Sequence, residues 1–309
     1  MTSAELPKAH GRPYITDGGL ETTLVFHERV DLPFFAAFPL VLSQEGRALL
    51  ERYFEPYFAL ASAHEAGFVL DTPTWRANPD WAERLGLSAD DLRTANLKAA
   101  AVIRDLRARR MPGRPVVLNG VLGPRGDGYV VGQAMSVPEA AAYHCPQMQA
   151  LRDGGVDMAS AVTMTSADEA AGIVLAARDC GLPVAVSFTV ETDGRLPSGE
   201  SLEQAIARTE RATGAYPAYY MINCAHPDHF ADTLETAGPW RERLGGVRAN
   251  ASRRSHAELD AATELDPGDP SELGRDYRRL RAKLPGLCVL GGCCGTDHRH
   301  LAAICEACF

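Results

Sequence analysis

Short apolar runs alternate with longer amphipathic segments along the whole chain. Eight of these runs are rich in Val, Ile, Leu or Ala without strict alternation, which is typical of strands buried on both faces of a parallel sheet. The expected strands are 14–17, 68–72, 116–122, 156–162, 184–190, 219–223, 246–250 and 287–290. The expected helices are 44–66, 90–109, 138–153, 167–180, 202–213, 226–237, 273–283 and 299–308.

This regular alternation predicts an α/β protein with a single (β/α)8 TIM barrel covering residues 1–309. Barrels of this type take about 250 residues, and more with insertions. The main alternative is a doubly wound open sheet, which is disfavoured because no G-x-G-x-x-G follows a strand and opens a helix. We expect the polar stretch 1–13 to be a flexible N-terminus.

The amino-acid composition limits which partners and which cellular compartment we expect for this protein. The net charge is −9 and no basic face is apparent, so nucleic acid is not an expected partner. No apolar run approaches the roughly 18 residues that cross a bilayer, and the N-terminus lacks the apolar core of a signal peptide. We therefore expect a cytoplasmic protein without a membrane partner; the pattern leaves its oligomeric state open.

Eight cysteines in a reducing compartment indicate metal binding, catalysis or packing before disulfides. Cys293 and Cys294 are adjacent and flanked by glycines, which pack poorly in a core. They follow the eighth expected strand, and Cys224 follows the sixth, so all three meet at the carboxyl ends of the barrel strands. Three thiolates with one open position are typical of a catalytic zinc site.

The remaining cysteines are expected to pack as small apolar side chains. They are Cys145, Cys180 and Cys288, together with Cys305 and Cys308 on the terminal helix. Other polar groups also follow strands and should converge on the same mouth: 17–19 after the first strand, 71–72 at the second and 119–123 at the third.

Five segments resemble motifs of the homocysteine S-methyltransferase family. They are G-G-C-C-G-T at 291–296, N-C at 223–224, D-G-G-L-E-T at 17–22, T-P-T-W-R-A-N at 72–78 and G-V-L-G-P at 120–124. The matches keep the family's order across residues 14–304. The paired cysteines with their upstream partner are the most specific of them.

The resemblance implies a (β/α)8 barrel in which Cys224, Cys293 and Cys294 bind Zn²⁺ and the metal binds the acceptor thiol. It implies transfer of a methyl group from an activated donor to homocysteine, giving methionine. Relatives use S-methylmethionine, S-adenosylmethionine or betaine, and we expect a stand-alone enzyme with a small soluble donor. The residues expected to contact the acceptor are Asp17, Gly18, Gly19, Glu21, Thr72, Thr74, Glu191 and Asn223.

One position departs from the family pattern. The family carries a glutamate after the fourth strand that helps to hold the amino group of homocysteine, and Val162 stands there. Glu21 and Glu191, each just past a strand, are the candidates to replace it. Polar groups at later strand ends, His226, Asn250 and Ser252, could shape the pocket. We do not expect His226 to bind the zinc, because a fourth protein ligand would close the site.

An activated methyl donor is usually a cation, which aromatic rings can hold. The candidates near strand ends are Trp75, Tyr129 and Phe188. Three alternatives remain at this stage: the same methyl transfer to another thiol or a selenol, a zinc hydrolase, and a non-catalytic zinc or redox thiol cluster. The hydrolase is disfavoured because no H-E-x-x-H occurs.

Overall fold

The computed structural model describes residues 6–7 and 11–309. Eight parallel strands pair in chain order and close on themselves through β1 and β8, which confirms the predicted barrel. They are β1 (Tyr14–Ile15), β2 (Gly67–Asp71), β3 (Val116–Leu122), β4 (Met158–Met164), β5 (Val184–Phe188), β6 (Tyr219–Asn223), β7 (Leu244–Ala249) and β8 (Val289–Gly292). Residues 1–5 and 8–10 of the expected flexible N-terminus lie outside the described residues.

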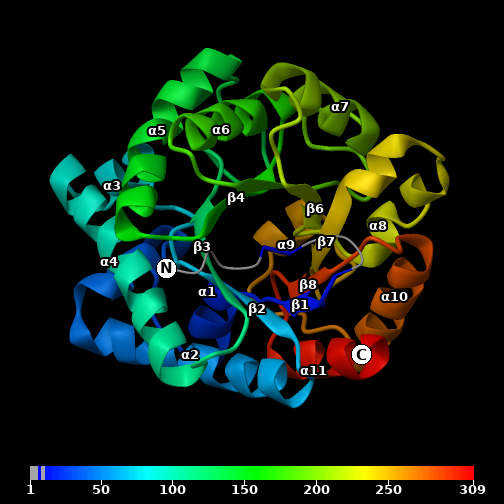
Figure 1. The fold of residues 1–309 in the computed structure, drawn as a ribbon, viewed down its shortest axis with the longest axis horizontal. Coiled ribbons are helices and arrows are strands. Elements are labelled where there is room, and N and C mark those ends of the chain that lie inside the picture. Colours follow the sequence, from blue (N-terminus) through cyan, green and yellow to red (C-terminus); the bar gives the residue numbers. More distant parts are fainter. Residues whose placement is uncertain (1–5, 8–10) are drawn as a thin grey trace.

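Helices surround the strands (Figure 1). The long ones are α2 (Gln44–Ala63), α4 (Ala89–Arg110), α5 (Val137–Gly154), α6 (Ala167–Asp179), α7 (Leu202–Thr213), α10 (Pro270–Lys283) and α11 (His298–Cys308). The short ones are α1 (Leu20–Thr22), α3 (Pro79–Arg84), α8 (Pro227–Phe230) and α9 (His256–Asp260). Local sequence sets several of their ends: Ser201 and Gln204 form a capping box at α7, and Gly214 ends it in the left-handed conformation.

The helix expected at 226–237 is wrong in length. α8 ends at Phe230 and is followed by a separate 3₁₀ turn, Thr233–Glu235. Asp232, Thr233 and Thr236 explain the break, because short polar side chains compete for backbone hydrogen bonds and weaken a helix. The sequence also missed the short elements between β1 and α2, the helix α3, the turn Pro239–Arg243 and the helix α9.

The barrel interior is apolar at the amino ends of the strands and polar at their carboxyl ends. On β3, Val117 belongs to the apolar layer and Asn119, two residues later, to the polar one. The same alternation gives the polar layer its members, which are Asp71, Asn119, Ser160, Ser187, Asn223 and Arg248. A larger apolar core lies between the strands and the helices. The mouth of the barrel therefore rests on a buried polar layer.

The helices of the structure can be compared with the expectation that the chain does not cross a membrane. Among the described residues, no helix combines the length and the apolar character that a bilayer crossing requires.

Candidate active site

A cavity of about 590 Å³ opens at the carboxyl ends of the strands. We call its inner part the floor, formed by Asp17, Arg248, Cys224, Cys293 and Cys294. We call its outer part the rim, formed by Phe34, Phe35, Trp75, Asp127, Tyr129 and Leu259. Floor residues lie at or next to strand ends, whereas rim residues lie on the loops that follow β1, β2, β3 and β7.

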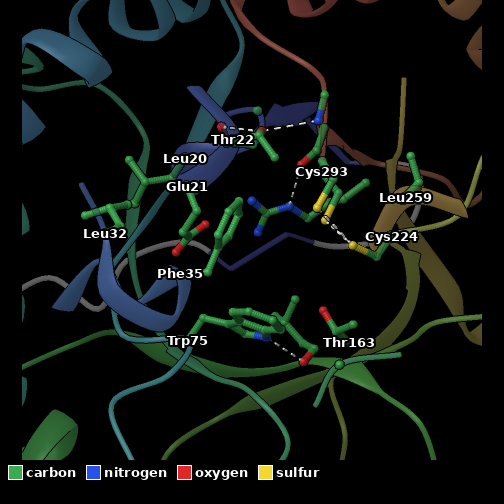
Figure 2. A pocket seen from close by; sticks show the side chains of 18 of the residues that line it. Leu20, Glu21, Thr22, Leu32, Phe35, Trp75, Thr163, Cys224, Leu259 and Cys293 are labelled. Carbon is green, nitrogen blue, oxygen red and sulfur yellow. Dashed lines mark hydrogen bonds between the residues drawn. The ribbon is translucent and has the colours of Figure 1, made fainter. Parts of the chain in front are cut away.

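The three expected cysteines meet at the floor. The Sγ atom of Cys224 lies 2.8 Å from that of Cys293 and 3.5 Å from that of Cys294. All three thiols are free, and their sulfurs lie within 4.8 Å of one another. Figure 2 shows the sulfurs of Cys224 and Cys293 facing each other at one end of the cavity. The trio can therefore offer three soft ligand atoms to one metal ion.

Glycines allow the turn after β1 to lie against the paired cysteines. A Cβ atom on Gly19 would come within 2.6 Å of the carbonyl oxygen of Cys293, and one on Gly18 within 2.7 Å of that of Thr296. Gly19 N–H donates to the Thr296 carbonyl over 3.0 Å. A larger residue at either position would push the two segments apart, so the glycines are needed for the two backbones to lie in contact.

The sulfurs share protons unequally. Hydrogen bonds from the thiols of Cys224 and Cys294, helped by nearby Arg248, hold the pKa of Cys293 well below its usual range. The pKa of Cys224 is raised, since its proton is held by Cys293 and Cys294. Asn223 lies beneath, with Nδ2 3.8 Å from the Cys293 sulfur. Cys293 is therefore the sulfur that most readily carries negative charge.

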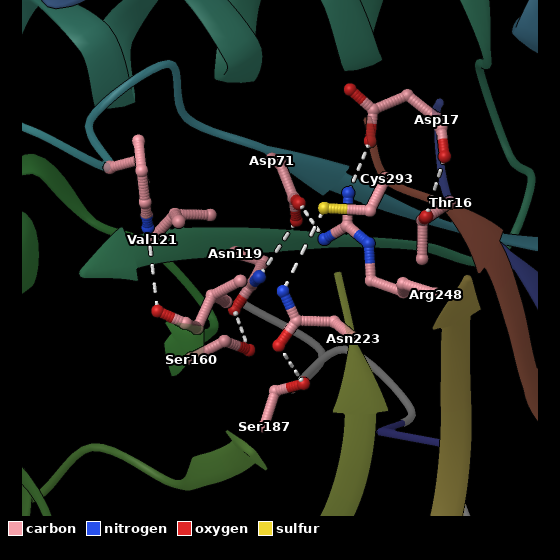
Figure 3. Close-up of polar contacts among 12 residues, drawn as sticks. Thr16, Asp17, Asp71, Asn119, Val121, Ser160, Ser187, Asn223, Arg248 and Cys293 are labelled. Atoms are coloured by element: carbon pink, nitrogen blue, oxygen red, sulfur yellow. Dashed lines mark hydrogen bonds and ion pairs between the residues drawn. The ribbon is translucent and has the colours of Figure 1, made fainter. Parts of the chain in front are cut away.

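Arg248 occupies the floor beside the sulfurs with two carboxylates (Figure 3). Its Nη2 donates to Asp17 over 2.7 Å, and its Nη1 donates to Asp71. Tyr53 donates to the second oxygen of Asp17 over 3.0 Å. Burial alone would lower the pKa of Arg248, but Asp71 and Asp17 more than offset this and raise it. Both oxygens of Asp17 are thus engaged within the protein.

Most of the site residues expected from sequence share this cavity. Those that line it are Asp17, Gly18, Gly19, Glu21, Thr72, Trp75, Tyr129, Cys224, Cys293 and Cys294. The other four, Thr74, Phe188, Glu191 and Asn223, lie outside its lining. Thr74 and Asn223 are buried and donate to Val121 on β3 and Thr163 on β4, and Phe188 stacks on Tyr220 in the core. Glu191 pairs with His256.

The two carboxylates proposed to replace the family's glutamate therefore differ in place: Glu21 lines the cavity and Glu191 does not. Val162 lines the cavity and leaves its wall apolar at that position. Glu21 projects into the cavity beside Phe35 and across from Cys224 and Cys293 (Figure 2). Burial raises the pKa of Glu21 to about 7, and the charge on Cys293 adds to the shift. Glu21 is the candidate of the two that lies in the cavity.

Two aromatic candidates have different surroundings. Trp75 lies on the cavity wall, where its Nε1 donates to the Val162 carbonyl over 3.4 Å and Arg76 stacks on its ring. Tyr129 instead reaches the floor: its hydroxyl lies 3.5 Å from the Cys224 sulfur and 3.4 Å from the Cys294 sulfur. Trp75 therefore lines the cavity wall, whereas Tyr129 contacts two of the three cysteine sulfurs.

His226, two residues past Cys224, is occupied elsewhere. Its Nδ1 accepts from the backbone N–H of Asp228 and caps α8, and its Nε2 lies 4.0 Å from Asp276. His226, Asp228 and Asp276 form a second group close enough to hold a metal, but Arg253 and Arg279 already pair with the two carboxylates. His226 is thus engaged with the start of α8 and lies close to Asp276.

Sequence reasoning missed Arg248, His256 and the cavity-lining part of the loop after β7. A signal existed for Arg248, because a charged residue inside an apolar strand is almost never buried without partners. His256 had no such signal, since it lies on a polar stretch that reads as an exposed loop. Asn250 was noted, and its Nδ2 donates to the Cys224 carbonyl over 3.0 Å.

Comparison with known proteins agrees with the barrel fold. A family model described as homocysteine S-methyltransferase matches residues 14–308. The chain is 24% identical to Homocysteine S-methyltransferase 1 of Arabidopsis thaliana, covering 97% of this chain and 94% of that protein. The oxidized form of the Escherichia coli homocysteine methyltransferase MmuM superposes with a TM-score of 0.71 at 20% identity, over 94% of each chain. Its metallated form gives 0.71 at 19% identity, over 96% of each chain.

Proposed function

The chain belongs to the homocysteine S-methyltransferase family, and we propose that it is a zinc-dependent enzyme that methylates the thiol of homocysteine to give methionine. The observation that carries this proposal is the convergence of three free cysteine sulfurs on the floor of the cavity. The methyl donor would be a cation of the S-methylmethionine, S-adenosylmethionine or betaine type.

The cysteine trio fits a zinc ion. Two sulfurs on one tetrahedral zinc, with Zn–S of about 2.3 Å, lie roughly 3.8 Å apart. The 3.5 Å between the sulfurs of Cys224 and Cys294 is close to this, and the 2.8 Å between Cys224 and Cys293 requires a modest separation. Thiolate ligands favour zinc over harder cations. The metallated form of the Escherichia coli relative supports a metal in this family.

When bound, zinc would supply the charge that lets an incoming thiol lose its proton near neutral pH. In the transfer, the acceptor thiol releases its proton, its sulfur forms a bond to the methyl carbon, and the donor's bond to that carbon breaks. The donor's sulfur or nitrogen leaves as a neutral group. The floor residues hold the acceptor sulfur, and the cavity wall must align the donor for in-line displacement.

Glu21 supplies the acceptor's ammonium site in this proposal. Val162 cannot bind a cation, and Asp17 has both oxygens engaged by Arg248 and Tyr53. Glu21 faces the sulfurs across the cavity, and among the described residues Arg76 and Arg248 act on its charge without forming an ion pair with it. A charged hydrogen bond there would contribute about 1.5–3 kcal/mol. On the donor side, Trp75, Phe35 and the carboxylates Asp127 and Asp260 provide an aromatic and acidic wall for a cation.

The same observations favour one second candidate, methyl transfer to a different thiol or selenol. Val162 removes one expected ammonium ligand, and Arg248 neutralises Asp17, so the floor is less committed to an amino acid. The chemistry at the sulfurs would be unchanged.

A matrix of donors and acceptors on zinc-loaded protein tests both candidates. S-methylmethionine, S-adenosylmethionine and betaine, each with a labelled methyl, would be paired with homocysteine, selenohomocysteine and 4-mercaptobutanoate, which lacks the amine. We expect transfer to homocysteine with at least one donor, and transfer to 4-mercaptobutanoate to be about tenfold or more weaker. Failure of homocysteine with every donor, together with success of 4-mercaptobutanoate, would replace the acceptor assignment. Failure of all pairs would remove the methyl-transfer proposal.

A further inference from the structure

Cys224 adopts a backbone conformation that is unusual for its residue type. Its φ is +56°, in the left-handed region that side chains with a Cβ rarely enter. A residue held this way costs conformational free energy and persists only where surrounding groups fix it. Because Cys224 directly follows β6 and supplies one of the three sulfurs, whatever fixes this backbone also aims that sulfur.

The groups that fix it act on the carbonyl oxygen of Cys224. His256 Nε2 donates to this oxygen over 2.7 Å, and Asn250 Nδ2 donates over 3.0 Å. Thr189 adds a longer contact of 3.4 Å from its hydroxyl. The two short bonds use both lone pairs of the carbonyl. The shorter of them comes from His256, a residue that sequence analysis did not select.

His256 is itself tightly placed. It begins α9 and is 4% exposed, and its Nδ1 lies 3.0 Å from a carboxylate oxygen of Glu191, which follows β5. Its ring stacks on Tyr129 with 4.1 Å between ring centres and 13° between planes. The hydroxyl of Tyr129 touches the sulfurs of Cys224 and Cys294. One imidazole thus joins the loops after β3, β5 and β7 to the cysteine trio.

We propose that Glu191 and His256 form a positioning pair that holds Cys224 in its left-handed conformation and Tyr129 against the sulfurs. The pair touches neither of the proposed substrates, because Glu191 and His256 lie outside the lining of the cavity. It acts through the main chain of Cys224 and through the stacked ring of Tyr129. The proposal rests on the proposed function in that the trio binds zinc. It gives Glu191, expected from sequence to bind the acceptor, a different role.

Zinc affinity of the full chain tests this pair without measuring activity. Metal-free protein would compete with a chromophoric chelator for zinc, with His256→Ala compared to wild type. Groups that orient metal ligands typically change metal affinity by about 10–100-fold, and we expect a loss in this range. Cobalt(II) in place of zinc should show a changed absorption spectrum in His256→Ala, because the geometry of the sulfur ligands changes. His229→Ala is the matched control, since the His229 ring donates to the Arg253 carbonyl and is not part of the Glu191–His256 pair.

Two milder variants separate positioning from folding. His256→Gln keeps an amide donor for the Cys224 carbonyl and should retain much of the zinc affinity lost in His256→Ala. Glu191→Gln should weaken zinc binding by about twofold to tenfold, the worth of a neutral hydrogen bond. If His256→Ala does not fold, these two variants decide the matter.

The outcomes distinguish the two proposals. If all three variants had the zinc affinity and the cobalt spectrum of wild type, the positioning pair would be overturned and the proposed function would stay intact. An equal loss in His256→Ala and His229→Ala would also overturn it, because the effect would then be general destabilisation. Wild-type protein that fails to bind zinc would contradict the proposed function instead.

Discussion

The floor of the cavity is built on strand ends, whereas its rim is built on loops. At the floor, Cys224 follows β6 directly and Arg248 lies within β7, so hydrogen bonds between neighbouring strands set their positions. At the rim, Phe34 lies in the connection after β1 and is 49% exposed, and Leu259 lies on the short helix α9, in the long connection after β7. The difference separates two tasks, because reactive groups need fixed geometry and recognition can vary with loop sequence.

The contacts of the rim reinforce this division. Arg76 donates to the Phe34 carbonyl, lies 3.6 Å from Asp127 and stacks on Trp81. It therefore links the loops after β1, β2 and β3 to each other through side chains. At the floor, backbone hydrogen bonds add to the side-chain pairs: Gly292 N–H donates to the Asp17 carbonyl, and Cys293 N–H donates to the Ala249 carbonyl. Substitutions should therefore cost most at the floor.

The largest effect is expected for Cys224→Ser. Removing one of three proposed zinc ligands should weaken metal binding by more than the roughly 10–100-fold that an outer partner contributes. Methyl transfer should fall in parallel. The measurement is zinc content after dialysis together with transfer of a labelled methyl. Cys288→Ser is the matched control, because Cys288 is buried at the amino ends of the strands. Full zinc content in Cys224→Ser would mean that Cys224 is not needed to bind the metal, and the floor would lose its proposed role.

Arg248→Met should produce the largest loss of stability. It leaves Asp17 and Asp71 buried without their cation, and breaking a buried pair costs about 3–5 kcal/mol. Arg93→Met is the control: Arg93 and Asp153 form a partly exposed pair at 2.8 Å, and such pairs contribute about 0.2–1 kcal/mol. Urea unfolding of both variants gives the difference. Equal losses would mean that the floor is no more tightly specified than the helix surface.

The same division explains what the sequence could predict. Apolar runs located the strands, so the convergence of Cys224 with Cys293 and Cys294 followed from topology alone. The rim was harder, because loop residues carry no periodicity that places them. Glu21 and Glu191 both followed strands, yet one enters the cavity and the other pairs with His256. Only the path of the loop after β7, which the pattern left undefined, separates them.

Glu21→Gln probes the border between floor and rim. Loss of a charged hydrogen bond should raise the acceptor's KM about tenfold to hundredfold, with a smaller effect on the donor's. In wild type, Glu21 with its pKa near 7 becomes neutral as pH falls, so the acceptor's KM should rise below about pH 7. This pH dependence should disappear in Glu21→Gln. Steady-state kinetics between pH 6 and 8 give both results.

The effect of Glu21 on the free energy of unfolding should change with pH in the opposite direction to its effect on acceptor binding. The folded pKa of Glu21 is raised above the value of 4.5 for an unperturbed carboxyl, so the folded state binds more protons between these values. Its stability is therefore expected to fall as pH rises from about 4.5 to 7. Glu21→Gln removes this loss and should be more stable than wild type above pH 7. A variant with unchanged KM and unchanged pH dependence would place the acceptor's ammonium elsewhere.

Trp75→Leu should have the smallest effect, and it addresses the rim alone. A ring facing a cation contributes about 0.5–2 kcal/mol, so the donor's KM should rise by roughly twofold to thirtyfold while the acceptor's KM stays near its wild-type value. Phe34→Leu, an exposed rim substitution, should change stability by less than about 0.5 kcal/mol and serves as the control. Zinc affinity should be unchanged in both, because neither ring contacts a sulfur. If Trp75→Leu weakened zinc binding as strongly as a floor substitution, the rim and the floor would be one coupled unit, and recognition could not vary independently of the chemistry.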